Sequence, residues 1–339
     1  MISGREFVQT YAKKGYVAWE AAALELARQG QLTPWPWVDL PLTLPGTDDT
    51  AIVKVSSDVL SVGPFEDLVR LPLTPSAAQS ILNLSGSLMT TPWLEYQIWR
   101  AAPAKLQPIR SGEMRQINKG ADLVQYADHS RHIDQQLRQL TVVPGTLTSG
   151  IKKGIVVSNM MRAGKVIIFG WYIHYLVDKN GRLTDQPARD IFEDHRALDA
   201  VNRQPIQPES DAHGDFYVDY SHGVRAVAPY CTVRGQTMAT IDLYRDPTFA
   251  RFVSHNGPVR IPRYPSKVPP ALPPPAITGP LTDLFDYGHD PGPFFRPPTP
   301  GVAELGLQAL AWNASTGRLL ALPRRHLHQP RLIRGRGQW

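Results

Sequence analysis

The sequence predicts an α+β protein in which N-terminal helices pack on a mostly antiparallel sheet, followed by a proline-rich, largely irregular C-terminal tail. Apolar residues recur at helical spacing near the N-terminus, whereas β-branched and aromatic runs gather between residues 150 and 245. Fourteen of the 32 prolines lie in residues 258–300, and such a density excludes long helices and central strands. We therefore expect one domain over residues 1–255, with its functional segment at 150–245.

Helices are expected at five places along the chain: residues 5–12, 16–29, 76–84, 92–102 and 121–140. Two of them begin with the same dipeptide, Thr74-Pro75 and Thr91-Pro92. Threonine is a favourable N-cap, and proline fits the first helical position because the N–H it lacks has no partner there. Gly30 is a suitable stop for the second helix.

Strands are expected over residues 52–62, 68–73, 140–143, 155–157, 165–176, 215–227 and 237–243. Residues 33–44, by contrast, are punctuated by prolines, among them Pro34, Pro36 and Pro41. This punctuation predicts an irregular connection.

Residues 256–339 are expected to form a separate tail that is disordered or an artefact of the reading frame. Its first half is typical of a polyproline-type linker, and PxxP spacing at 262–265 and 270–273 is compatible with a protein partner. Its last 17 residues hold five arginines and no acid.

Charge and cysteine content exclude several classes of function. The chain carries 36 basic and 30 acidic residues, but the five arginines of residues 323–339 account for most of the excess, leaving 31 against 30. A nearly neutral body argues against nucleic acid as a partner. Cys231 is the only cysteine, which excludes an intramolecular disulfide and a cysteine-based zinc site.

No membrane span is expected, because the longest nearly unbroken apolar run, residues 166–177, has 12 residues and a bilayer needs about 20. The first residues lack the apolar core of a secretory signal. The simplest expectation is a cytoplasmic protein.

The densest polar cluster of the chain lies in residues 213–225. It contains His213, Tyr217, Asp219, Tyr220, Ser221, His222 and Arg225. Two interpretations carry equal weight: a catalytic site, or a strand and turn whose polar groups pair with one another and with the backbone.

Side-chain alternation limits the roles within this cluster. In an extended chain Ser221 and His222 point to opposite faces and cannot form a nucleophile–base pair. A turn at residues 220–223 would make that pairing feasible again. We expect His222 to act as general base or acid, with Asp219 orienting or polarising its partner.

Ser221 is the best local nucleophile or water-positioning group in this hypothesis, and Tyr220 and His213 are further catalytic candidates. Lys153 or Arg225 would stabilise an oxyanion. Substrate contacts are expected from Arg225, Lys152, Trp171 and Tyr217, although a solvated surface pair remains the favoured interpretation of Lys152 and Lys153.

Other candidates are weaker. Cys231 lies in an apolar stretch, so a core position is favoured over a papain-like pairing with His222. His213, His222 and Asp219 are suitable metal ligands, but their spacing matches no metal motif and no metal is expected. His129 and His132 are expected at the surface. No glycine-rich nucleotide motif is present, so no cofactor is expected.

Four segments together resemble a family of uncharacterised bacterial proteins. They are Gly150–Val157, Val166–Trp171, Pro205–Pro208 and Asp219–Arg225, similar to GHKKDVV, AIYGWH, PIQPL and DYSHGVR. The resemblance spans about residues 5–230 and implies a hydrolase-type protein without specifying the bond. Ile151, Gly154 and Tyr172 stand where the family has histidine, aspartate and histidine. An essential role for any of these three would make this chain inactive or altered.

Three functions remain open from the sequence. The first is a cofactor-free hydrolase of an amide or ester bond, acting on a small-molecule or cell-wall-derived substrate, including a lactone of the acyl-homoserine type. The second is a non-catalytic glycan- or cell-wall-binding module that uses Trp171 and Tyr217 as stacking surfaces. The third is an assembly protein whose proline-rich tail binds a partner.

Overall fold

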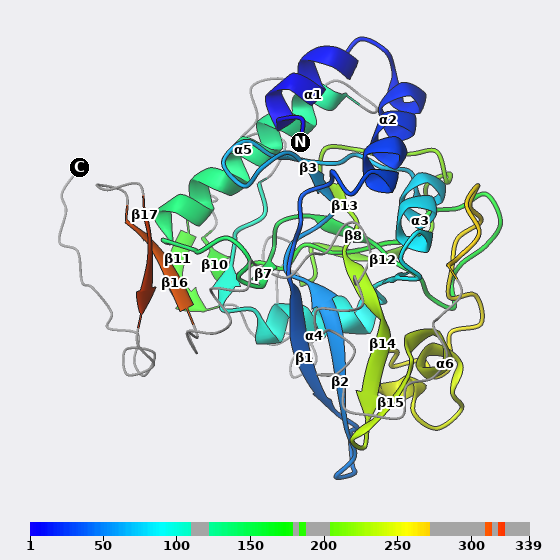
Figure 1. Ribbon diagram of the computed structural model, residues 1–339. Coiled ribbons are helices and arrows are strands. Elements are labelled where there is room, and N and C mark those ends of the chain that lie inside the picture. The colour runs from blue at the N-terminus through cyan, green and yellow to red at the C-terminus, as the bar shows by residue number, and fades with distance from the viewer. Residues whose placement is uncertain (110–121, 179–182, 188–203, 272–308, 314–317, 323–339) are drawn as a thin grey trace. The chain divides into compact units, whose positions relative to one another are not determined.

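A computed structural model describes residues 1–109, 122–178, 183–187, 204–271, 309–313 and 318–322 (Figure 1). The chain divides into two units, residues 1–296 and 297–339. Helices and antiparallel sheets together confirm the α+β class. Residues 188–203, most of the proline-rich segment and the basic residues 323–339 lie outside the described residues.

Five helices of the first unit match the predicted ones closely, whereas α6 (Thr240–Arg245) forms where a strand was predicted. The five are α1 (Gly4–Tyr11), α2 (Tyr16–Arg28), α3 (Pro75–Asn83), α4 (Pro92–Ala101) and α5 (Leu123–Gln139), and a 3-10 turn η2 (Ala250–Phe252) follows α6. The Thr74 hydroxyl accepts the Ala77 N–H at 3.3 Å, and the Thr91 hydroxyl accepts the Leu94 N–H at 3.1 Å. Both expected Thr-Pro starts are thus confirmed.

The main sheet is antiparallel and has the order β1-β2-β14-β15, with β5 also paired to β14 (Figure 1). Its strands are β1 (Trp37–Thr43), β2 (Thr50–Ser56), β5 (Leu88–Met89), β14 (Ala226–Val233) and β15 (Gln236–Ala239). The expectation of an irregular connection at 33–44 is wrong, because β1 lies there. This strand is at the sheet edge, where Pro41 can be accommodated although it donates no ladder hydrogen bond.

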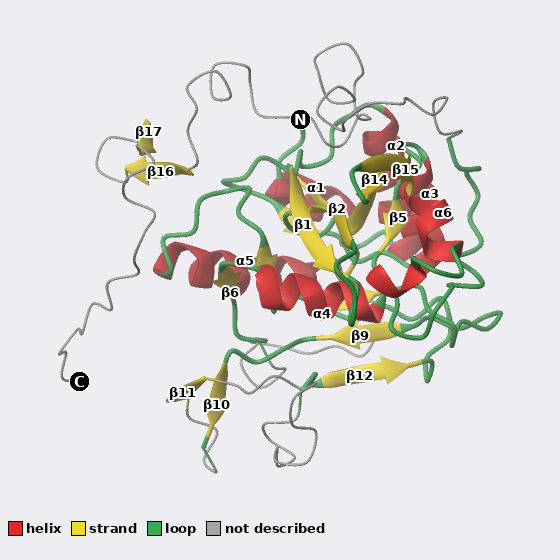
Figure 2. Cartoon of the chain, turned by 90° about the horizontal axis from the view of Figure 1, so that it is seen from below, coloured by secondary structure: helices red, strands yellow, loops and turns green. Residues whose placement is uncertain are grey.

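A second sheet carries the functional segment in the order β12-β9-β8-β13. Its strands are β8 (Lys153–Ile155), β9 (Ile168–Gly170), β12 (Gln207–Ser210) and β13 (His222–Gly223). Strand β13 runs parallel to β8, with His222 opposite Lys153. Helix α4 contacts both β9 and β1, and Figure 2 shows it between the two sheets.

Short strand pairs complete the described structure. The first unit holds β3 (Ser61–Val62) with β4 (Val69–Arg70), β6 (Ala104–Lys105) with β7 (Thr148–Ser149), and β10 (Tyr175–Val177) with β11 (Leu183–Pro187). The described part of the second unit is a hairpin of β16 (Ala309–Asn313) and β17 (Arg318–Leu322). The sequence did not predict this hairpin within its irregular tail.

Several expected strands are shorter than predicted because turns interrupt them. No strand forms at 140–143, where the chain reverses after α5: Thr141 has a φ of 54° and the Val142 N–H donates to the Leu137 carbonyl at 2.9 Å. The segment 215–227 bends before β13, and the segment 237–243 changes from β15 into α6. Local apolar character alone does not reveal these reversals.

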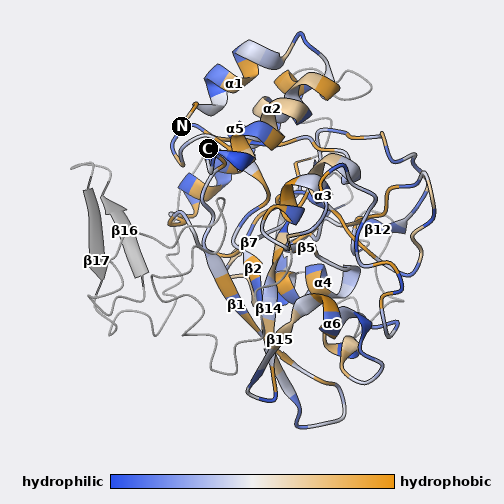
Figure 3. Ribbon diagram, turned by 45° about the vertical axis from the view of Figure 1, so that its right-hand side comes forward, coloured by the Kyte–Doolittle hydropathy of each residue, from blue (hydrophilic) through white to orange (hydrophobic). Residues whose placement is uncertain are grey.

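Helix α5 presents a polar and an apolar side, which Figure 3 shows as alternating blue and orange segments. Its buried residues are Leu123, Gln125, Tyr126, His129, Ser130 and Ile133. Their spacing of three or four residues forms one continuous stripe. Because the stripe includes tyrosine, histidine and serine, α5 brings polar groups into the interior near the functional segment.

The body continues beyond residue 255, so the predicted domain boundary falls too early. The Val259 N–H donates to the Tyr244 carbonyl at 2.7 Å, and the Ala271 N–H donates to the Asn83 carbonyl at 2.7 Å. The buried Tyr264 hydroxyl donates to the Val156 carbonyl and accepts the Ile167 N–H. Residues 256–271 therefore pack on the body.

Within the described parts of the chain, no helix has both the length and the apolar character required to cross a membrane.

Candidate functional site

A tight turn at residues 219–222 builds the centre of the site. The His222 N–H donates to the Asp219 carbonyl at 3.1 Å, and the Ser221 N–H donates to Asp219 Oδ1 at 2.8 Å. The Ser221 hydroxyl also donates to Asp219 Oδ1. Aspartate commonly stabilises turns by accepting N–H groups two residues ahead. The turned alternative for residues 220–223 is thus the one that forms.

The turn does not create a nucleophile–base pair. The Ser221 hydroxyl is held by Asp219, and neither ring nitrogen of His222 has a hydrogen-bond partner among the described residues. His222 Nε2 lies 3.6 Å from Asp219 Oδ2. Asp219 therefore stands between the serine and the histidine, and Ser221 is a positioning residue for the carboxylate.

The pairing of β13 with β8 brings the two lysines to this turn. The Lys153 N–H donates to the Ser221 carbonyl at 2.7 Å, and Lys152 Nζ donates to the Tyr220 carbonyl at 2.5 Å. A Cβ atom at Gly223 would approach the Lys152 side chain to 2.8 Å, so glycine is needed for this close contact. Segments separated by nearly 70 residues in sequence thereby converge at the turn.

Tyr217 and His213 extend the cluster. Tyr217 donates its hydroxyl to Asp219 Oδ2 at 3.4 Å, and its ring stacks on His213 with centroids 4.0 Å apart. The Tyr217 ring also meets the His222 ring edge-on at 5.7 Å. His213 therefore reaches the carboxylate only through Tyr217, whereas the ring of Tyr220, another expected catalytic residue, lies 5.3 Å from His129 and 6.3 Å from Trp171.

The members of the cluster differ in their access to solvent. The Asp219 side chain is 21% exposed, whereas His222 is 1% exposed and Ser221 is buried. Lys153, Tyr217, His213 and Tyr220 are half-buried. Asp219 and Lys153 are therefore the charged groups that a substrate can reach, and His222 lies behind the carboxylate.

Burial and neighbouring charges separate the protonation states of Asp219 and His222. Burial lowers the pKa of His222 to about 4, against the opposing effect of Asp219. Burial alone would raise the pKa of Asp219, but His222, Lys153 and the bonds from Ser221 bring this pKa below its ordinary value. At neutral pH the pair consequently holds an anionic carboxylate and a neutral imidazole.

Three expected substrate-binding residues are buried instead. Lys152 lies beneath the turn with its ammonium 4.9 Å from the centre of the Tyr126 ring, and burial lowers its pKa well below the usual range. Trp171 is 5% exposed, with Lys153 Nζ 5.0 Å from the centre of its indole ring. Arg225 Nη2 donates to the Thr148 carbonyl at 2.7 Å. Arg225 and Lys152 thus hold backbone carbonyls, and only Tyr217 keeps a half-exposed position.

The remaining candidate residues, Cys231, His129 and His132, differ in how deeply they are buried. Cys231 is buried in β14, and burial raises the pKa of its thiol to about 12, which argues against a nucleophile. The expectation of a surface position for His129 is wrong. This histidine is buried and lies 5.3 Å from the Tyr220 ring, whereas His132 is partly exposed.

Tyr126 and His129 are site neighbours that the sequence did not single out. Both belong to the buried stripe of α5 and lie beneath the 219–222 turn through Lys152 and Tyr220. Tyr126, His129 and Ile133 follow one another at three and four residues. This helical spacing is the sequence pattern that indicates a shared buried face. The described residues contain no group of three or more His, Cys, Asp or Glu side chains arranged to hold a metal ion.

No protein-family model, no curated protein and no solved structure matches the chain. The resemblance to a bacterial family therefore stays an expectation, and the functional inference depends on the geometry of the site.

Proposed function

We propose that the protein is a cofactor-free hydrolase of an amide or ester bond, with its reaction centred on Asp219 and Lys153. The observation that carries this proposal is an accessible carboxylate kept anionic beside an ammonium group, with Ser221, Tyr217 and His222 fixing its orientation. A fixed base beside a fixed cation is suited to activating water against a carbonyl group.

In the proposed reaction Asp219 accepts a proton as the water oxygen attacks the carbonyl carbon of the substrate. The carbonyl π electrons move to the oxygen, and the Lys153 ammonium stabilises the resulting negative charge. The tetrahedral intermediate then re-forms its carbonyl and expels the amine or alcohol, which takes the proton back from Asp219. The products are a carboxylic acid and the leaving group, and no redox step is required.

His222 has a supporting role in this mechanism rather than that of the attacking base expected from the sequence. Its neutral ring lies behind Asp219, where it limits the carboxylate's freedom without taking the substrate's proton. Ser221 fixes the other carboxylate oxygen, and Lys152 holds the turn through the Tyr220 carbonyl. These three residues position the base.

The structure gives less support to a glycan-binding module. Such a module needs exposed aromatic faces, but Trp171 is buried and Tyr217 is stacked on His213. Esters, acyl-homoserine lactones and cell-wall amides all remain within the proposed class, because the site groups contact the bond rather than the rest of the substrate.

The test is a panel of p-nitrophenyl esters, acyl-homoserine lactones and peptidoglycan fragments, with and without EDTA. Wild type is compared with Asp219→Asn and with Asp49→Asn, a control whose carboxylate is also 21% exposed and pairs with an arginine. Turnover that survives EDTA and Asp49→Asn but is lost in Asp219→Asn supports the proposal. Silence of folded wild type across the panel, or equal turnover in both variants, would overturn it.

A further inference from the structure

A cavity lies at the end of α5, and none of the residues of the proposed hydrolytic centre lines it. It has a volume of about 120 Å³ and is bounded by the end of α5, the loop at 142–146 and the segments that carry Trp35 and Phe65. For comparison, an apolar cavity of about 150 Å³ accommodates benzene. The space therefore suits a ligand of only a few non-hydrogen atoms.

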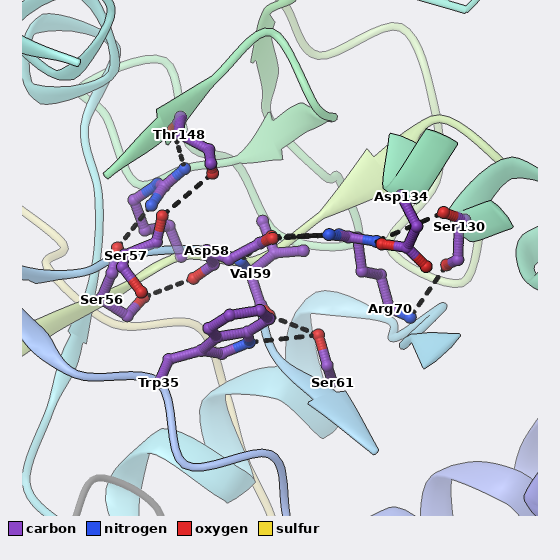
Figure 4. Close-up of polar contacts among 11 residues, drawn as sticks. Trp35, Ser56, Ser57, Asp58, Val59, Ser61, Arg70, Ser130, Asp134 and Thr148 are labelled. Carbon is purple, nitrogen blue, oxygen red and sulfur yellow. Dashed lines mark hydrogen bonds and ion pairs between the residues drawn. The ribbon is translucent and has the colours of Figure 1, made fainter. Parts of the chain in front are cut away.

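A buried ion network forms the polar side of this cavity. Arg70 Nη2 lies 2.7 Å from Asp58 Oδ2, and Arg70 Nη1 lies 2.9 Å from Asp134 Oδ1 (Figure 4). Two carboxylates thus share one guanidinium, and the charges of Lys152 and Arg225 also act on Asp58. Arg70 and Asp58 also line the cavity but are buried and paired with each other, so Asp134 is the partly exposed carboxylate of this network.

Asp134 has one oxygen available for such a ligand. Its Oδ1 accepts from Arg70, whereas its Oδ2 has no hydrogen bond to the described residues. Its side chain is 23% exposed and lines the cavity. By contrast, Asp58 is fully used, since it accepts from Arg70 and from the Val59 N–H.

Two aromatic side chains, Trp35 and Phe65, also line the cavity. Their rings have centroids 5.1 Å apart. Trp35 donates its indole N–H to the Ser61 hydroxyl at 3.2 Å (Figure 4), so its ring rather than its N–H is offered to a ligand. Aromatic faces attract cations and cover alkyl groups.

Arg138 carries a positive charge that opposes the binding of a cation at this site. It lies one helical turn after Asp134 and also lines the cavity, but it is exposed. Water screens an exposed guanidinium much more than a partly buried carboxylate. Removing the Arg138 charge should consequently strengthen the binding of a cation.

We propose that this cavity binds a small organic cation, with its ammonium group at Asp134 and its apolar part against Trp35 and Phe65. The inference does not depend on the hydrolase proposal, because none of these residues belongs to that site. A compact alkyl amine of about five non-hydrogen atoms fits the space, and an affinity on the order of 1 mM is expected for so small a ligand.

Isothermal titration calorimetry of the full chain with n-butylammonium, n-butyrate and n-butanol tests this proposal. Saturable binding of the ammonium ion alone is expected. Asp134→Asn should weaken it about tenfold, because the amide still accepts from Arg70 but carries no charge, whereas Asp49→Asn should leave it unchanged. A preference for butyrate or butanol, absence of saturable binding, or unchanged affinity in Asp134→Asn would overturn the proposal.

Arg138→Gln provides an independent variant if Asp134→Asn does not fold, since Arg138 is exposed and its replacement leaves the buried network intact. Tighter binding of n-butylammonium supports the proposal. Unchanged or weaker binding contradicts it.

Discussion

Asp219 combines local and long-range roles in one side chain. Its Oδ1 closes the turn through Ser221, and its Oδ2 meets Tyr217 and His222. Lys153, from a distant strand, adds a positive charge. A turn-forming aspartate is common by itself, but this arrangement also leaves the carboxylate accessible and ionised, which is the condition for a base at neutral pH.

Replacing Asp219 by asparagine should lower kcat/KM by about 10²- to 10⁴-fold, the usual contribution of a general base. Steady-state kinetics on whichever panel substrate is turned over provides the measurement. Circular dichroism must show an intact fold, because asparagine can still accept from Ser221. Wild-type kinetics in a folded Asp219→Asn protein would contradict the assigned base.

His222 should make the stability of the protein depend on pH. Its pKa is about 4 in the folded state, against an ordinary value of 6.5, so between these values the unfolded chain binds more protons. The neutral His222 ring therefore makes its full contribution to the free energy of unfolding above pH 6.5. This contribution is lost progressively as the pH falls from 6.5 through 4. From pH 7 to pH 5 the loss should be about 2 kcal/mol.

Urea unfolding at pH 7 and pH 5 measures this contribution. His222→Gln should lose less stability over the interval than wild type does. His132→Gln, a change at a partly exposed histidine, should keep the wild-type dependence. Identical pH dependence in wild type and His222→Gln would show that the buried imidazole does not control it.

Among the secondary structure elements, α4 shows how a local signal also serves a tertiary contact. Its N-cap residue Thr91 accepts the Leu94 N–H and donates to the Val253 carbonyl. Thr74, the N-cap of α3, accepts the Ala77 N–H at a longer distance, and its own backbone N–H donates to Glu20 Oε1 at 2.6 Å. The two sequence signals look alike, but only one ties its helix to a segment more than 160 residues away.

Thr91→Ala should therefore destabilise the protein more than Thr74→Ala, by about 2 against about 1 kcal/mol. Urea unfolding of both variants gives the comparison. Thr91→Ser keeps the hydroxyl and should recover most of the loss. Equal losses in the two alanine variants would mean that the bond to Val253 contributes nothing measurable.

Over the whole chain, residues 256–271 belong with the first unit although their composition is that of a linker. Tyr264 makes two hydrogen bonds to the backbone beside β8 and β9, and Arg263 donates to the Ser87 and Gly86 carbonyls. This segment fixes the sheet that carries Lys153. Its removal should consequently affect both the stability of the body and the site.

A chain that ends at residue 296 should keep the melting temperature of the body, whereas one that ends at residue 255 should melt lower or aggregate. The first endpoint is the boundary of the unit, and the second removes the Tyr264 anchor. Scanning calorimetry compares them. Tyr264→Phe in the full chain should cost about 1–3 kcal/mol. An unchanged melting temperature in the chain that ends at residue 255 would contradict the anchoring role of Tyr264.

Prediction of the fold succeeded where neighbouring residues carry the signal. Thr74-Pro75 and Thr91-Pro92 begin helices because capping involves only the first turn. It failed for β1, because Pro41 is tolerated only at a sheet edge, and strand order is a property of the assembled sheet. The candidate site shows the same division: its cluster was located from sequence, but the buried partners on α5 were not.

The sequence by itself determined the α+β class, the capped helices and the segment in which the polar cluster lies, because composition, capping and periodicity act over a few residues. Tertiary structure alone decided that Asp219 stays partly exposed while His222 is buried beside it, and that Arg225, Lys152 and Trp171 are buried. Burial and the charges that shift a pKa come from segments distant in sequence. They exist only after packing has brought those segments together.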